Sequence, residues 1–153
     1  MKKRAYMICL LAFMLIMSMI PAAALAADDD GYGLWVDGTE VTVDNADNVL
    51  GDDTVSYNAE TKTLTLNGAE IDTAHTDGSY TSGIYAEGDI NIVLRGSSSI
   101  NISGGQITAG VHANGVISIS GGGSLGITAG GAGIETRAIS TGYTADEAGV
   151  VIN

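Results

Sequence analysis

Four acidic side chains surround the longest loop that precedes the first clear repeat of this sequence. They are Asp72, Asp77, Glu87 and Asp89. Carboxylate oxygens gathered at one corner of a chain suit Ca²⁺, a hard cation that takes about six to eight oxygen ligands. The sequence contains no EF-hand loop, and Asp is also an ordinary turn residue. The loop is therefore a candidate calcium site, with solvated turn carboxylates as the alternative.

Aromatic rings are the second group of side chains with a recognisable chemical use. Sugars stack on flat rings and hydrogen-bond to the polar groups around them. Tyr80 lies in a polar loop, and Tyr85 follows an inward-facing Ile84, so we expect Tyr85 to point outward. Trp35 stands between two aliphatic residues near the start of the mature chain, which favours packing in a terminal hairpin over a role as a sugar platform. Tyr80, Tyr85 and Trp35 are the predicted carbohydrate-binding residues.

The two histidines, His75 and His112, do not form a metal-binding motif. Neither has a second His or Cys at ligand spacing, so no zinc site is predicted. His112 follows Val111, which is expected to face inward. We therefore expect His112 on the surface, next to Tyr85 in the following repeat.

Residues suited to catalysis are few. Beyond residue 27 the only cations are Lys62, Arg95 and Arg137, and they fall at separate corners. A pectinase-type enzyme would need paired carboxylates of different pKa, or an Arg or Lys base beside calcium. The sequence has no G-x-S-x-G, P-loop or H-E-x-x-H motif. We predict a protein that is not an enzyme, with a fragment of a polysaccharide lyase or hydrolase as the catalytic alternative.

Residues 1–27 have the layout of a secretory signal peptide. Three basic residues precede an apolar run over residues 5–20, and small residues ending in Ala24-Leu25-Ala26 follow. An uncleaved membrane anchor is the alternative, although the run is short of the roughly 20 residues needed to span a bilayer. We predict a bacterial protein that is secreted and has no membrane contact after cleavage.

Removal of this segment leaves a mature chain with 18 acidic and three basic side chains, a net charge of −15. Such a polyanion does not bind nucleic acid. The single cysteine is Cys9, so the mature chain has no disulfide framework. All 22 glycines remain, and the length suits one domain.

From residue 83 the sequence repeats itself loosely, with Gly-rich corners between short runs of alternating aliphatic residues. Gly83-Ile84, Gly110-Val111 and Gly133-Ile134 open three successive passes, the third of them shorter in its spacing than the second. Each pass carries three short strands. A period of about 25 residues with this content is typical of a right-handed parallel β-helix, a solenoid. An antiparallel β-sandwich is the alternative.

The repeats predict aliphatic columns, in which residues of successive passes lie side by side. The columns are Ile84 with Val111 and Ile134, Ile90 with Ile117 and Ile139, and Ile100 with Leu125.

The all-β mature chain divides into two parts. Residues 28–62 are predicted to form N-terminal capping hairpins, one around the Asp37-Gly38 turn and one around the Asn58–Thr61 loop. Residues 63–153 are predicted to form the rungs, the successive turns of the β-helix. The last residues, 149–153, read as a core strand with nothing polar to cover it. We expect either a solenoid truncated at its C-terminus or a partner that makes end-to-end contact with the open rung.

Two segments carry a resemblance to a known family. Residues 49–71 read VLGDDTVSYNAETKTLTLNGAEI, and residues 83–100 read GIYAEGDINIVLRGSSSI. Over about residues 34–103 the chain resembles secreted bacterial surface proteins of the Firmicutes type that carry a carbohydrate-binding domain. The resemblance implies an extracellular solenoid that binds polysaccharide, in some relatives with calcium. We predict polysaccharide or another surface component as the partner, with a structural or adhesive solenoid that has no small ligand as the alternative.

Overall fold

The computed structural model describes residues 31–130, 135–141 and 150–152. The chain divides into two units, Met1–Asp30 and Gly31–Asn153, and the described residues all lie in the second. The predicted signal peptide therefore lies outside the described residues. Among the described residues, no helix has the length and apolarity needed to span a bilayer.

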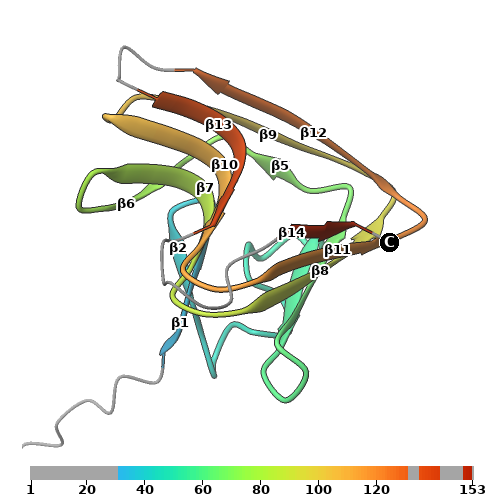
Figure 1. Ribbon diagram of the computed structural model, residues 1–153. Helices are drawn as coiled ribbons and strands as arrows, with labels where there is room; N and C mark the ends of the chain where they lie inside the picture. The colour runs from blue at the N-terminus through green and yellow to red at the C-terminus, as the bar shows by residue number, and fades with distance from the viewer. Residues whose placement is uncertain (1–30, 131–134, 142–149, 153) are drawn as a thin grey trace, which may run out of the picture. The chain divides into compact units, whose positions relative to one another are not determined.

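The predicted all-β class is confirmed (Figure 1). The described strands are β1 (Gly31–Val36), β2 (Thr39–Thr42), β3 (Val55–Asn58), β4 (Thr63–Asn67), β5 (Glu70–Ile71), β6 (His75–Asp77), β7 (Tyr80–Ala86), β8 (Ile90–Arg95), β9 (Ser97–Ser103), β10 (Ile107–Ala113), β11 (Ile117–Gly121), β12 (Ser124–Gly130), β13 (Glu135–Thr141) and β14 (Val150–Ile152).

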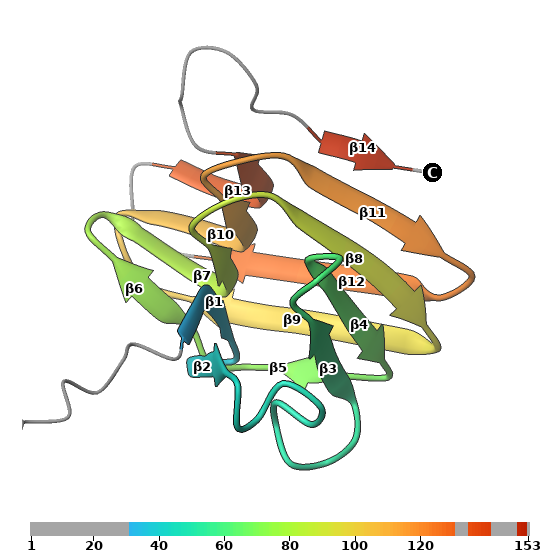
Figure 2. The same ribbon diagram turned by 90° about the horizontal axis from the view of Figure 1, so that it is seen from below.

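The strands form three sheets, and the chain visits each sheet in turn (Figure 2). The first has the order β13-β10-β7-β1-β2, with β6 also paired to β7; the second is β14-β11-β8-β4-β3; the third is β12-β9-β5. The pairs β7–β10, β8–β11 and β9–β12 are all parallel. Antiparallel pairs, β1–β7 and β3–β4 among them, make the first two sheets mixed.

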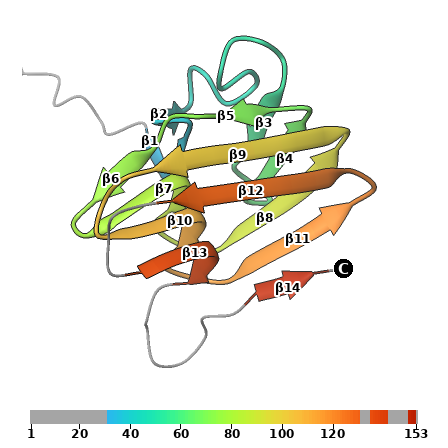
Figure 3. The same cartoon turned by 90° about the horizontal axis from the view of Figure 1, so that it is seen from above.

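A constant spacing in sequence relates the partners in three of the parallel pairs, β7–β10, β8–β11 and β9–β12. Ile84 pairs with Val111 and Ile90 with Ile117, as predicted, and the two pairs have the same sequence separation. The third sheet keeps this separation, so β9 and β12 run side by side in register (Figure 3). The two residues of each pair therefore lie side by side on strands about 4.8 Å apart.

The core lies where the inward faces of the three sheets meet. Along β9, buried and exposed residues alternate over the whole strand, as expected when successive side chains point to opposite faces. Aliphatic residues from the three sheets fill the interior, and among the largest that are fully buried are Leu64, Leu66, Ile71, Ile84, Ile92, Ile100 and Ile117.

Both predicted hairpins are present. Asp37 and Gly38 have φ values of 53° and 74°, the left-handed pair that a tight two-residue turn requires, and they join β1 to β2 in an antiparallel pair. The Asn58–Thr61 loop joins β3 to β4, and Lys62 ends it at φ 50°. The hairpins border the long sheets, because β1 pairs with β7 and β4 with β8.

The predicted registry of the third pass is wrong. Val111 pairs with Ile139 and not with Ile134, which lies outside the described residues. Ile139 belongs to the first sheet, and Ile117 pairs instead with Val150. The step from β10 to β13 is therefore longer than the recurrence of Gly110-Val111 as Gly133-Ile134 suggested.

The third sheet shows a smaller error of the same kind. Ile100 pairs with Ile127, whereas Leu125 lies beside Ser98. A shift of two residues leaves every side chain on its original face, so hydrophobic alternation cannot distinguish the two registers. The equal corner lengths of successive passes decide between them.

Candidate functional site

Three aromatic side chains lie in one row across the first sheet. Trp35 of β1 is the register partner of Tyr85 of β7, and Tyr85 is the partner of His112 of β10. Ile84 and Val111, the neighbours of Tyr85 and His112, belong to the core. Because successive residues of a strand point to opposite faces, the row lies on the outer face, as predicted for Tyr85.

Two further rings complete an aromatic cluster, which we define as Trp35, His75, Tyr80, Tyr85 and His112. His75 stacks on Trp35 with 4.4 Å between ring centroids, and Tyr80 stacks on His112 at 4.2 Å. Tyr85 lies 5.6 Å from the rings of both Trp35 and His112. The structure thus brings Trp35, Tyr80 and Tyr85, which we selected from the sequence as candidate sugar platforms, into one place.

The central members of the aromatic cluster are buried, which corrects the expectation for His112. That side chain is 1% exposed and Tyr85 is 3% exposed, although both lie on the outer face. The rings of His75 and Tyr80 contact them from the β6–β7 hairpin. Trp35, His75 and Tyr80 are half-buried and form the accessible rim of the aromatic cluster.

Polar side chains lie next to the aromatic cluster and form hydrogen bonds with it. The Tyr85 hydroxyl donates to Asp77 Oδ2 at 2.6 Å and accepts from Asn114 Nδ2 at 3.2 Å. Asn114 Oδ1 lies 3.3 Å from His112 Nε2. Burial raises the pKa of Tyr85 to about 12, and the hydrogen bond to Asp77 adds to the rise.

This pKa predicts a stability change at high pH that depends on one hydroxyl. The folded-state pKa of Tyr85 is about 12, above the value of about 10 in an unfolded chain. Its contribution to stability is therefore complete below pH 10 and is lost as pH rises through 12. Urea unfolding at pH 9, 10 and 11 should show a steeper fall in the free energy of unfolding for the wild type than for Tyr85→Phe. Equal slopes for the two proteins would contradict the assignment.

The four carboxylates of the predicted calcium site are all exposed and do not form one group. Asp77 accepts the Tyr85 hydroxyl, and Asp89 Oδ1 accepts the backbone N–H of Val116 at 2.9 Å. Within residues 31–130, 135–141 and 150–152, no three His, Cys, Asp or Glu side chains are placed to hold one ion. Calcium therefore stays a prediction.

Sequence reasoning missed the part played by His75 and Asn114. The signal for Asn114 was available, because it directly follows Ala113, the register partner of Ala86, and so falls at the corner beside Tyr85. Its backbone N–H donates to the Ala86 carbonyl at 2.9 Å. His75 carried no such signal, because the loop that places it has no counterpart in the later repeats.

Comparison with family models, with curated proteins and with solved structures gives no match for this chain.

Proposed function

We propose that this chain is an exported right-handed parallel β-helix that binds polysaccharide through the accessible rim of the aromatic cluster. The observation that carries the proposal is the convergence of Trp35, Tyr80 and Tyr85 on one outer face. The half-buried rings of Trp35 and Tyr80 offer flat apolar surface beside polar atoms, which is the combination that sugar rings recognise.

Strand order supports the solenoid part of the proposal. The chain returns to the same three sheets in the same order, and each return from β8 onward lies parallel to the strand before it in that sheet. Crossovers between parallel strands of one sheet are right-handed in nearly all proteins, which gives the proposed hand. The signal-like residues 1–27 support export.

The outer faces extend the proposed binding surface with polar groups. Exposed positions along β8 and β9 include Asn91, Ser99 and Asn101. Partners in parallel strands lie about 4.8 Å apart, so hydroxyl and amide groups can repeat along a polymer of sugars. The aromatic rim would supply stacking and these groups would supply hydrogen bonds.

A polysaccharide array tests this function directly. We expect the full chain to bind at least one polysaccharide, and Trp35→Ala to weaken that binding about tenfold, a loss of about 1.4 kcal/mol. Trp35→Phe, which keeps a ring, is the matched control and should retain most of the affinity. Thermal melting establishes that both variants are folded.

Two outcomes of the array would count against parts of the proposal. If no polysaccharide on the array binds the protein even at high protein concentration, the proposed polysaccharide binding is wrong. Calcium assistance requires that EDTA reduce the signal, so binding unchanged by EDTA would remove calcium while leaving the rest of the proposal intact.

The second candidate function is a structural or adhesive solenoid without a small ligand. It is favoured by the near-complete burial of Tyr85 and His112, whose ring faces contact each other and their neighbours. In that case Trp35→Ala would lower the melting temperature without altering any interaction on the array.

A further inference from the structure

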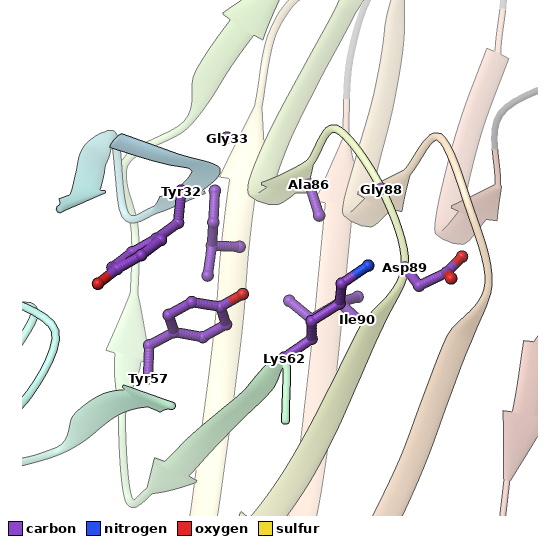
Figure 4. Close-up of a pocket in the computed structure, with 9 residues that line it drawn as sticks. Tyr32, Gly33, Tyr57, Lys62, Ala86, Gly88, Asp89 and Ile90 are labelled. Carbon is purple, nitrogen blue, oxygen red and sulfur yellow. The ribbon is translucent and has the colours of Figure 1, made fainter. Parts of the chain in front are cut away.

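A hollow lies at the corner between the first two sheets, and no member of the aromatic cluster lines it (Figure 4). Leu34, Ala86 and Ile90 are its aliphatic lining residues, and Tyr32 and Tyr57 stand along one side. Its volume is about 80 Å³, and it is open to solvent on one side. This is below the range of about 300–1,000 Å³ found for small-molecule sites, so a bound sugar unit would lie partly outside the hollow.

The polar groups that face the hollow are both hydrogen-bond donors. In Figure 4 the Tyr57 hydroxyl and the Lys62 ammonium project over the hollow, whereas the Tyr32 hydroxyl and the Asp89 carboxylate point away. Asp89 is held in that direction by the Val116 N–H. Burial and the neighbouring Tyr32 raise the pKa of Tyr57, so its hydroxyl keeps its proton at neutral pH.

Lys62 owes its position to the turn that ends the β3–β4 loop. Its backbone has φ 50°, and its carbonyl accepts the Asn91 N–H at 2.9 Å. These two features fix the direction in which the side chain leaves the chain. Its ammonium forms no ion pair or hydrogen bond with any described residue, including Asp89, which also lines the hollow.

Neither of the two cations whose side chains are described, Lys62 and Arg95, forms an ion pair with a described residue, and both side chains are exposed. The sequence has 18 acidic residues and six basic ones, and Lys62 is one of only three cations beyond residue 27. A carboxylate from outside the chain would find an ammonium and a phenol hydroxyl ready to donate, the charge-assisted contact that anions favour. Repulsion from distant acidic residues is screened over about 8 Å at physiological salt, so the short-range contact decides.

We propose that this hollow binds a uronic acid unit of the polysaccharide, with its carboxylate accepting from Lys62 and Tyr57. The sugar ring would lie against the tilted pair of Tyr32 and Tyr57, whose ring centroids are 5.3 Å apart. The inference rests on the proposed function for the polymer and adds the chemical class of one of its units.

Titration of the full chain with glucuronate, observed by NMR, tests the hollow without any polymer. We expect glucuronate to bind about tenfold more tightly than uncharged glucose or than acetate, which lacks the ring. Lys62→Gln should lose about tenfold in affinity, and Tyr57→Phe a smaller factor. Arg95→Gln is the matched control, because it removes the same charge from another exposed residue that does not line the hollow, and it should change the affinity less than twofold.

Several results would overturn the proposal. If glucose and glucuronate bind equally well, the carboxylate takes no part in recognition. If acetate and glucuronate bind equally well, the sugar ring takes no part. Equal losses in Lys62→Gln and Arg95→Gln would mean that bulk charge alone is responsible. Failure of the glucuronate proposal can be distinguished from failure of the proposed function. The Trp35 variants test the proposed function through their binding to the polysaccharide array, and they should bind glucuronate as the wild type does.

Discussion

Replacement of Gly121 by valine is expected to lower the free energy of unfolding by about 3 kcal/mol or more. Gly121 ends β11 with φ 109°, a conformation that costs a residue with a side chain about 1–3 kcal/mol. A Cβ at this position would also lie 2.8 Å from the backbone nitrogen of Leu94 and would overlap the Leu94 carbonyl oxygen. Leu94 is its register partner in β8, so the clash falls on backbone that the sheet holds in place.

The neighbouring residue supplies the control for this prediction. Gly122 has nothing within 4 Å of its Cβ position and no positive φ, so Gly122→Ala should change stability by about 0.5 kcal/mol or less. Thermal melting followed by circular dichroism compares the two variants. If Gly121→Val melts within a few degrees of the wild type, the described approach of β11 to β8 is incorrect.

Truncation of Ile92 to alanine is expected to cost about 2–5 kcal/mol, through lost burial and the cavity left behind. Ile92 is fully buried, and in the second sheet it lies between its register partners Leu64 and Ile119. Leu64 and Ile119 belong to β4 and β11, strands that are each paired on both sides. The site therefore has little freedom to collapse around the missing atoms.

Ile92→Val is the graded control, because removal of a single methyl group typically costs about 0.5–1.5 kcal/mol. Urea unfolding of both variants gives the two free energies on one scale. A value below about 1 kcal/mol for Ile92→Ala, well under the usual range for a buried isoleucine, would show that position 92 does not face the core.

The parts of the fold that follow local rules were predictable from the sequence. The Asp37-Gly38 turn requires left-handed backbone at two successive residues, and few other pairs of residues adopt it. The pairing of Ile84 with Val111 followed from a corner sequence that recurs in the next pass. The pairing of Ile100 did not follow, because Leu125 and Ile127 are both apolar and share one face of β12.

Prediction of the candidate site was limited in a different way. The outward direction of Tyr85 follows from strand alternation, but its burial depends on the ring of His75, which reaches it from a loop outside the repeats. The role proposed for Lys62 could not be predicted from the sequence either. It depends on a left-handed backbone at residue 62 and on a hydrogen bond from Asn91, which belongs to the next pass of the chain.

The equal spacing of the parallel strands has a consequence for how the chain reaches its fold. The strands β10, β11 and β12 each close a loop of the same length onto a strand that precedes them, so each addition has nearly the same entropic cost. Assembly can therefore proceed along the chain, one strand upon the last, as the polypeptide emerges. The hazard on this route is a strand that docks two residues out of place, since that arrangement still buries its aliphatic side chains. A slip that placed Ile119 opposite Leu94, where Gly121 lies now, would bring a side chain against backbone and so would disfavour the misplaced strand.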